Sequence, residues 1–198
     1  MPDGVSGRPV WLLDFDGVLN AIARKPDPSA WPRELWVTGT AEVDGVAWPV
    51  LAARPVLAFV REVHVAGLAE IRWHSTWQQH ADAVIRPLLE LPAFPVQPSP
   101  EHGLGRAYEG WWKLPAAERV LHEEKRPLLW TDDDIRSERT RPGRGLGAVE
   151  GAERALLISP RANIGLTPKH LRQIREFLDG SPRLHEPASE DGPFTERA

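Results

Sequence analysis

The sequence predicts an α/β fold with a mainly parallel sheet, on the basis of two observations. Short apolar runs bounded by turn residues alternate along the chain with segments of helical periodicity, a pattern typical of βαβ units. Polar clusters also follow three of the apolar runs: Asp14 with Asp16, residues 74–76, and residues 132–134. Because the carboxyl ends of parallel strands meet at one edge of a sheet, we expect these clusters to lie together.

Two different apolar periodicities predict the strands and the helices. Buried strands are expected where apolar residues run together, at residues 10–15, 68–73, 127–131 and 155–159. Helices are expected where apolar residues recur every three or four positions, at residues 55–65, 77–91, 113–124 and 168–179. Thr167 suits the cap of the last helix and Pro168 its first position. Pro87 must kink or end the second helix.

A β-hairpin is expected between the first strand and the first helix. Residues 35–50 alternate in polarity and carry Asp44-Gly45, a favoured two-residue turn, at their centre. Loops are expected where proline, glycine or charge is concentrated, at residues 20–34, 92–110 and 136–151. The chain is long enough for a single domain over residues 1–180, and residues 181–198 are expected to form a disordered tail.

Composition narrows the class of protein. The 198 residues carry a formal net charge of −4, so nucleic acid would have to bind at a local basic patch. The chain has no cysteine, which excludes disulfides, thiolate metal sites and a cysteine nucleophile. Neither a signal-peptide core nor an apolar run of membrane-spanning length is present in the sequence. A cytoplasmic protein without a membrane partner is therefore expected.

Asp14 and Asp16 end the first apolar run and are followed by Gly17. Side chains alternate along a strand, so the two carboxylates are expected to leave the strand end on one side. Carboxylates held this close repel unless a cation lies between them or one holds a proton, which suits metal-assisted covalent chemistry. The alternative is structural, because Asp-Gly is also a common hairpin turn. Polar clusters at two later strand ends favour the catalytic interpretation.

The run Asp14-Phe-Asp16-Gly-Val-Leu resembles the first motif of the haloacid dehalogenase superfamily, most of whose members are magnesium-dependent phosphatases. A hydroxyl residue after the second strand, a lysine and paired aspartates follow in the family's order. The chain is most similar to short bacterial members with Trp-x-[Ser/Thr]-x-Trp and Trp-x-Asp-Asp signatures, and a similar domain occurs in some RNA-repair proteins. The resemblance covers residues 10–178 and implies a Rossmannoid three-layer fold without a large cap domain.

The resemblance also implies catalytic roles. Asp14 is expected to be the nucleophile that forms an aspartyl-phosphate. Asp16 is expected to protonate the leaving oxygen and then to activate water. The hydroxyl of Ser75 is expected to bind the phosphoryl group, and Lys113 to neutralise the charge on the phosphoryl and the nucleophile.

The implied cofactor is Mg²⁺. Asp132 and Asp133 are expected to complete its site, together with Asp14 and the backbone carbonyl of Asp16. Oxygen ligands suit Mg²⁺, which needs few carboxylates because it keeps several waters. Phosphoryl transfer spreads negative charge over oxygens, so a cation and a lysine both serve it.

Each assignment has a structural alternative. Ser75 and Thr76 are suited to capping the next helix, Lys113 is suited to a solvated surface, and residues 132–134 are suited to a helix start. Tryptophans near the motifs suit core packing better than base stacking. Four arginines lie among glycines in the loop over residues 136–151, and these suit either a phosphate cradle or a surface loop. They are Arg136, Arg139, Arg141 and Arg144.

The sequence leaves the activity open among related classes. The first hypothesis is a phosphatase acting on a phosphorylated small molecule, nucleotide or nucleic-acid end. A phosphotransferase and a non-catalytic binding module with the same fold are the alternatives. A two-stranded hairpin is too small to seal a pocket, so we expect a site open to solvent. The oligomeric state does not follow from the sequence.

Overall fold

A four-stranded parallel sheet forms the centre of the protein, as shown by a computed structural model that describes residues 7–97, 111–141 and 145–180. The strand order is β4-β1-β5-β6, so the first strand lies between the second and third strands of the sheet. The strands of this sheet are β1 (Val10–Leu13), β4 (Glu70–Trp73), β5 (Leu128–Thr131) and β6 (Ala155–Ile158). The expected parallel sheet is confirmed.

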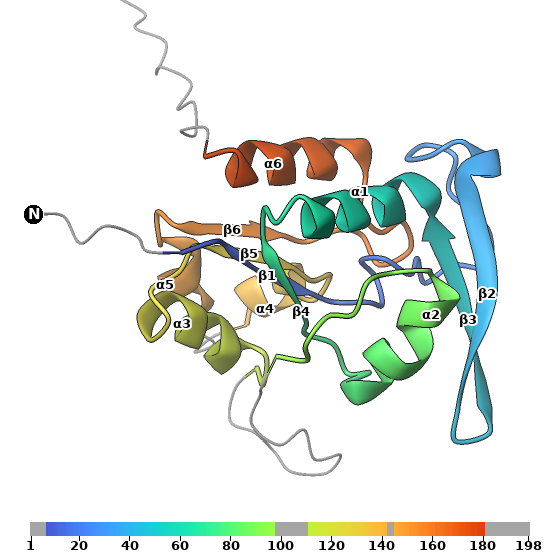
Figure 1. Cartoon of the computed structure of the whole chain (residues 1–198), viewed down its shortest axis with the longest axis horizontal. Coiled ribbons are helices and arrows are strands. Elements are labelled where there is room, and N and C mark those ends of the chain that lie inside the picture. Colours follow the sequence, from blue (N-terminus) through green and yellow to red (C-terminus); the bar gives the residue numbers. More distant parts are fainter. Residues whose placement is uncertain (1–6, 98–110, 142–144, 181–198) are drawn as a thin grey trace, which may run out of the picture.

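Helices cover both faces of the sheet because side chains alternate along each buried strand (Figure 1). The main helices are α1 (Arg54–Val65), α3 (Leu114–His122), α5 (Leu146–Glu150) and α6 (Pro168–Leu178). In β1, Trp11 and Leu13 pack in one apolar cluster with α1 and α6, whereas Val10 and Leu12 pack in a second cluster with α3 and α5. The fold is therefore a mixed α/β arrangement with a buried sheet.

The predicted start of the last helix, α6, and its cap are confirmed. The hydroxyl of Thr167 accepts a hydrogen bond from the His170 backbone N–H, and the Thr167 N–H donates to His170 Nδ1. Pro168 occupies the first helical position, where no backbone donor is needed. Ile174 then buries its side chain against the sheet.

The expected hairpin is also confirmed as a separate two-stranded antiparallel sheet, β2 (Trp36–Val43) and β3 (Val46–Ala53). Asp44 and Gly45 form its turn with positive φ angles of 52° and 76°. A short 3-10 turn, η1 (Arg33–Leu35), precedes it. Between β1 and β4, where every residue is described, the chain adds only η1, this hairpin and α1 as regular elements.

Two expectations need correction. Residues 136–151 are not one loop, because α4 (Ile135–Arg139) and α5 lie within or across them and bury Ile135, Leu146 and Val149. The helix expected over residues 77–91 is shorter and irregular, with a π-helical turn η2 (Ala81–Ile85) followed by α2 (Arg86–Leu88). Pro87 lies in that last turn, consistent with the expected stop.

Some expectations lie outside the described residues. These include most of the loop over residues 92–110, Arg144 and the tail from residue 181. Within the described ranges, no helix has the length and apolar character needed to cross a bilayer.

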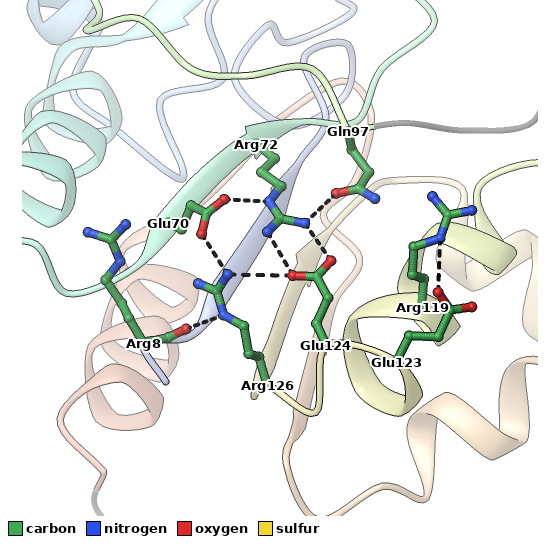
Figure 2. Close-up of polar contacts among 8 residues, drawn as sticks. All are labelled: Arg8, Glu70, Arg72, Gln97, Arg119, Glu123, Glu124 and Arg126. Carbon is green, nitrogen blue, oxygen red and sulfur yellow. Dashed lines mark hydrogen bonds and ion pairs between the residues drawn. The ribbon is translucent and has the colours of Figure 1, made fainter. Parts of the chain in front are cut away.

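A charged network occupies the edge of the sheet at β4 (Figure 2). Arg72 pairs with Glu70 and Glu124 through 2.7 Å contacts, and Arg126 Nη1 lies 2.6 Å from Glu70 Oε2. Burial alone would raise the pKa of Glu70, but the hydrogen bonds from Arg72 and Arg126 outweigh burial and lower it to about 2. The network links the edge strand to the segment after α3.

We predict that this network makes the unfolding free energy fall at acidic pH. The folded-state pKa of Glu70 lies below its usual value of 4.5, so its contribution is present above about pH 4.5 and is lost as pH falls toward 2. Replacing Glu70 with Gln should lower the unfolding free energy by about 1 kcal/mol at pH 7, the scale of partly exposed pairs. The difference from wild type should be about the same in melts at pH 7 and 5 and smaller at pH 3.

Glu123 provides the matched control, because it pairs with Arg119 in an exposed contact of 3.7 Å beside the network (Figure 2). The Glu123→Gln variant should melt like wild type at each pH. A Glu70→Gln deficit that stays constant from pH 7 to pH 3 would contradict the linkage.

Candidate functional site

Three carboxylates gather where β1 and β5 end. Asp14 follows β1 directly, and its N–H donates to Thr131 at the end of β5. Asp132 and Asp133 follow β5, and one oxygen from each of the three acids lies within 4.8 Å of the others. The sheet register therefore brings residues more than a hundred positions apart into one cluster, as expected from the parallel topology.

Lys113 supplies the counter-charge for two of these acids. Its Nζ lies 2.6 Å from Asp14 Oδ2 and 2.5 Å from Asp132 Oδ2, and all three side chains are buried. Burial would lower the pKa of Lys113, but the charges of Asp132 and Asp14 outweigh it and raise that pKa above its usual value. Lys113 is thus a buried cation, and its alternative assignment as a solvated surface residue is wrong.

The aspartates after β5 are strongly perturbed. Burial raises the pKa of Asp132 to about 8 against the opposing charge of Lys113. Burial, followed by the charges of Asp14 and Asp134, raises the pKa of Asp133 to about 6. Clustered acids whose pKa values are raised by burial and by one another are groups that a cation would favour in the ionised form.

The same acids also have a structural role. Asp132 Oδ1 accepts a hydrogen bond from the Asp134 backbone N–H at 3.0 Å, where α4 begins. Asp134 itself is exposed, as expected, and its side chain makes no cap hydrogen bond. One oxygen of Asp132, Oδ1, therefore has the helix-start role named as the alternative, and the other, Oδ2, accepts a hydrogen bond from Lys113.

Asp16 has a different set of partners from Asp14. Its Oδ1 accepts a hydrogen bond from Asn20 Nδ2 at 2.7 Å, and its Oδ2 accepts one from Trp77 Nε1 at 2.8 Å. Regular strand structure ends at Leu13, so the two-residue alternation that placed both carboxylates on one side does not extend to Asp16. Asp14 and Asp16, with one residue between them in the motif, are therefore held by separate groups.

Gly17 lets the loop after β1 approach the acidic cluster. Its φ is +71°, and a Cβ built there would lie 2.5 Å from Asp133 Oδ2. A larger residue would be strained and would collide with that carboxylate. The N–H groups of residues 18–20 donate to the Phe15 carbonyl in a compact turn, so the hairpin-turn alternative for Asp16-Gly17 is wrong.

The residues after β4 lie beside this cluster by register. Leu13 pairs with Trp73, so the chain reaches Ser75 at the level of Phe15. Ser75 is buried, whereas Thr76 is exposed. Ser75 Oγ accepts a long 3.5 Å hydrogen bond from the Trp77 N–H within the turn that precedes η2, whose own start carries no side-chain cap hydrogen bond.

Sequence reasoning gave no role to His74, Asn20 or Trp77. His74 Nε2 lies 3.0 Å from the Lys113 carbonyl, and burial together with the Lys113 charge lowers the pKa of His74 to about 3. A neutral imidazole thus donates to the backbone that carries the buried lysine. The contact between Asn20 and Asp16 could have been inferred from their spacing of four residues. The second partner of Asn20, the Leu51 N–H, is distant in sequence and could not.

Two arginines, one at the end of α4 and one just after it, are engaged within their own segment. Arg139 pairs with Glu150, and Arg141 Nη1 lies 2.8 Å from Glu138 Oε1. These contacts resemble ordinary surface ion pairs, and they favour the surface alternative over a phosphate cradle for these two side chains.

The donor set suits a hard divalent cation. Asp14, Asp132 and Asp133 offer three carboxylates, and an oxygen-only set of this kind is typical of Mg²⁺ sites. The Asp16 side chain is held elsewhere, by Asn20 and Trp77. We call Asp14, Asp132 and Asp133 the metal-type cluster. Asp16 is a separate carboxylate, held by its own hydrogen bonds.

No protein-family model matches this chain, and no curated protein matches it either.

We predict that Lys113 is essential to stability. Replacing it with Met leaves Asp14 and Asp132 buried and facing each other, and should lower the unfolding free energy by about 3–5 kcal/mol. Combining it with Asp132→Asn should recover part of this loss, because one of the two unpaired charges is removed. Urea denaturation of the single and double variants measures both effects.

The exposed Lys169 is the control, and its replacement by Met should change stability by less than about 0.5 kcal/mol. A Lys113→Met protein as stable as wild type would mean that the buried ion pairs do not support the fold.

Proposed function

We propose that this protein is a magnesium-dependent phosphomonoester hydrolase of the haloacid dehalogenase superfamily that works through an aspartyl-phosphate. One observation carries the proposal: buried Lys113 pairs with both Asp14 and Asp132 at the converging strand ends, while Asp16 is held apart by Asn20 and Trp77. Nucleophile and proton carrier need different surroundings, and these two acids have them.

Asp14 is the nucleophile in this proposal. Its Oδ atom bonds to phosphorus as the bond from phosphorus to the leaving oxygen breaks, and Asp16 gives its proton to that oxygen. Asp16 then takes a proton from water, whose oxygen attacks phosphorus and releases inorganic phosphate and free Asp14. Lys113 holds Asp14 in place and offsets the charge that gathers on the phosphoryl oxygens.

Asp14, Asp132, Asp133 and the carbonyl of Asp16 hold the metal in this proposal. A bound Mg²⁺ supplies electrostatic stabilisation of the phosphoryl charge. Ser75 is the hydroxyl that binds a phosphoryl oxygen, a role favoured over Thr76 because Ser75 is buried just after β4 whereas Thr76 is exposed.

The partners of Asp16 support its role as the proton carrier. Hydrogen bonds to both carboxylate oxygens fix its orientation, and Asn20 connects it to the hairpin through the Leu51 N–H at 2.8 Å. A proton carrier must be positioned before it is useful, because proton transfer requires contact distance to the leaving oxygen.

We predict distinct losses for the two acids. Asp14→Asn should abolish turnover of a phosphomonoester, because an amide is a poor nucleophile, with no loss of secondary structure by circular dichroism. Asp16→Asn should lower kcat by about 10²–10⁴-fold on a substrate with an alkyl leaving group. Phosphate release under saturating Mg²⁺ measures both rates.

Asp134→Asn is the matched control, since Asp134 is exposed beside the cluster, and it should keep wild-type turnover. Normal phosphate release by a folded Asp14→Asn protein would refute the covalent mechanism.

We predict that Mg²⁺ stabilises the folded state by mass action. Millimolar Mg²⁺ should raise the melting temperature of wild type and of Asp134→Asn, and Asp133→Asn should lose most of that shift. Asp133 is the informative position because Asp132 also pairs with Lys113, so its replacement changes the fold energy directly. Equal shifts in wild type and Asp133→Asn would contradict the proposed ligand set.

A further inference from the structure

A cavity of about 660 Å³ opens beside Asp16, and its lining residues do not include the three acids of the metal-type cluster. One wall comes from the hairpin, with Trp48 among its residues, and the other from the loop that carries Ile22 and Arg24. Trp77 contributes the part nearest Asp16, to which its Nε1 donates a 2.8 Å hydrogen bond. Its volume falls in the range of small-molecule sites, roughly 300–1,000 Å³.

Aromatic and aliphatic groups dominate this cavity. Trp48 and Trp77 meet edge to face with ring centroids 6.1 Å apart, and Phe15 and Trp77 also meet edge to face with ring centroids 5.7 Å apart. Trp48 is 49% exposed and Ile22 57% exposed, so two large apolar side chains stand open to solvent at the cavity. Exposed apolar groups gathered around a hollow mark a binding surface.

The polar groups of the lining are few. Asp16 and Asn20 bond to each other, and the remaining charged or hydroxyl side chains are those of Arg24 and Thr38. A sugar or polyol would lose water from many hydroxyls here without enough replacement partners. A flat ring loses little water and gains contact with indole, so the lining favours an aromatic ligand.

We propose that this cavity binds the base of a nucleotide substrate, so that the preferred substrate class is nucleoside monophosphates or phosphorylated nucleic-acid ends. This inference rests on the proposed function, because Asp16 must reach the leaving oxygen and the leaving group therefore lies on the Asp16 side. Trp48 is the stacking partner, and its exposure lets a base enter without moving the hairpin. Stacking on an indole accepts every base, since each has a π face.

The test compares two substrates with the same reacting group. Adenosine 5′-phosphate and ribose 5-phosphate share a primary phosphoester and differ in the base. We expect wild-type kcat/KM to be about fivefold to a hundredfold higher for the nucleotide, the range expected for stacking one base on an aromatic side chain. The Trp48→Ala variant should bring the ratio of the two kcat/KM values close to one, and Trp48→Phe should restore most of it.

Val46 gives a matched control. It lies two residues before Trp48 on β3, is equally exposed at 49%, and is not part of the cavity lining. Val46→Ala should keep the wild-type preference. Equal kcat/KM for the two substrates in wild type, or a preference that survives Trp48→Ala, would overturn base binding while leaving phosphatase activity in place.

Failure of the proposed function has a separate signature. If neither ester is hydrolysed, calorimetric titration with adenosine, which carries no phosphate, still decides the matter. Binding that Trp48→Ala weakens and Val46→Ala does not would support the cavity assignment, and absence of binding would overturn it.

A 5′-phosphorylated oligonucleotide identifies the source of the base. Higher kcat/KM on the oligonucleotide, falling with added salt, would support base binding at a nucleic-acid end, because phosphate contacts release counterions. Higher kcat/KM on the mononucleotide would support base binding from free nucleotides.

Discussion

The architecture of the site depends on one buried ammonium group between two carboxylates. Lys113 joins the ends of β1 and β5 to the start of α3, because its Nζ reaches Asp14 and Asp132 at the same time. A cation at a helix start is unfavourable next to the helix dipole, and burial adds a further cost. The carboxylates of Asp14 and Asp132 offset both costs only if β1, β5 and the start of α3 keep these positions relative to one another. His74, which directly follows β4, supports this arrangement by donating a hydrogen bond to the Lys113 carbonyl.

Asp14 and Asp16 are separated by only one residue, yet their side chains lie in different surroundings. The loop turns at Gly17, so Asp14 stays with Lys113 while Asp16 meets Asn20 and Trp77. The hairpin is thereby connected to the acid, since Asn20 also accepts from the Leu51 N–H. In our account, Asp14 with Lys113 handles the phosphoryl group, and the leaving group binds on the side of Asp16. The open cavity between hairpin and loop then becomes the place where substrates are distinguished.

Local patterns predicted the sheet strands, the hairpin turn, the cap at Thr167 and the convergence of Asp14, Asp132 and Asp133, whereas Lys113 was indicated only by the family resemblance. Each of the locally predicted features depends on short-range periodicity or on the rule that parallel strand ends meet. The helices within residues 135–150 were missed because charges and glycines surround their few apolar positions, and burial of Leu146 and Val149 on the sheet overrides weak propensity. The contact from Trp77 to Asp16 joins residues 61 positions apart, and no spacing in the sequence indicates it.

The most direct test of the central claim is to trap the phosphate on Asp14. Asp16→Asn protein, loaded with Mg²⁺ and given an aryl phosphate whose leaving group needs no proton, should form the aspartyl-phosphate and hydrolyse it slowly. Borohydride reduction converts an aspartyl-phosphate to homoserine, and peptide mass spectrometry locates it. Our account predicts homoserine at position 14 and unmodified aspartate at positions 132 and 133. Phosphate release by wild type with no modification at position 14 in the trapped variant would contradict it.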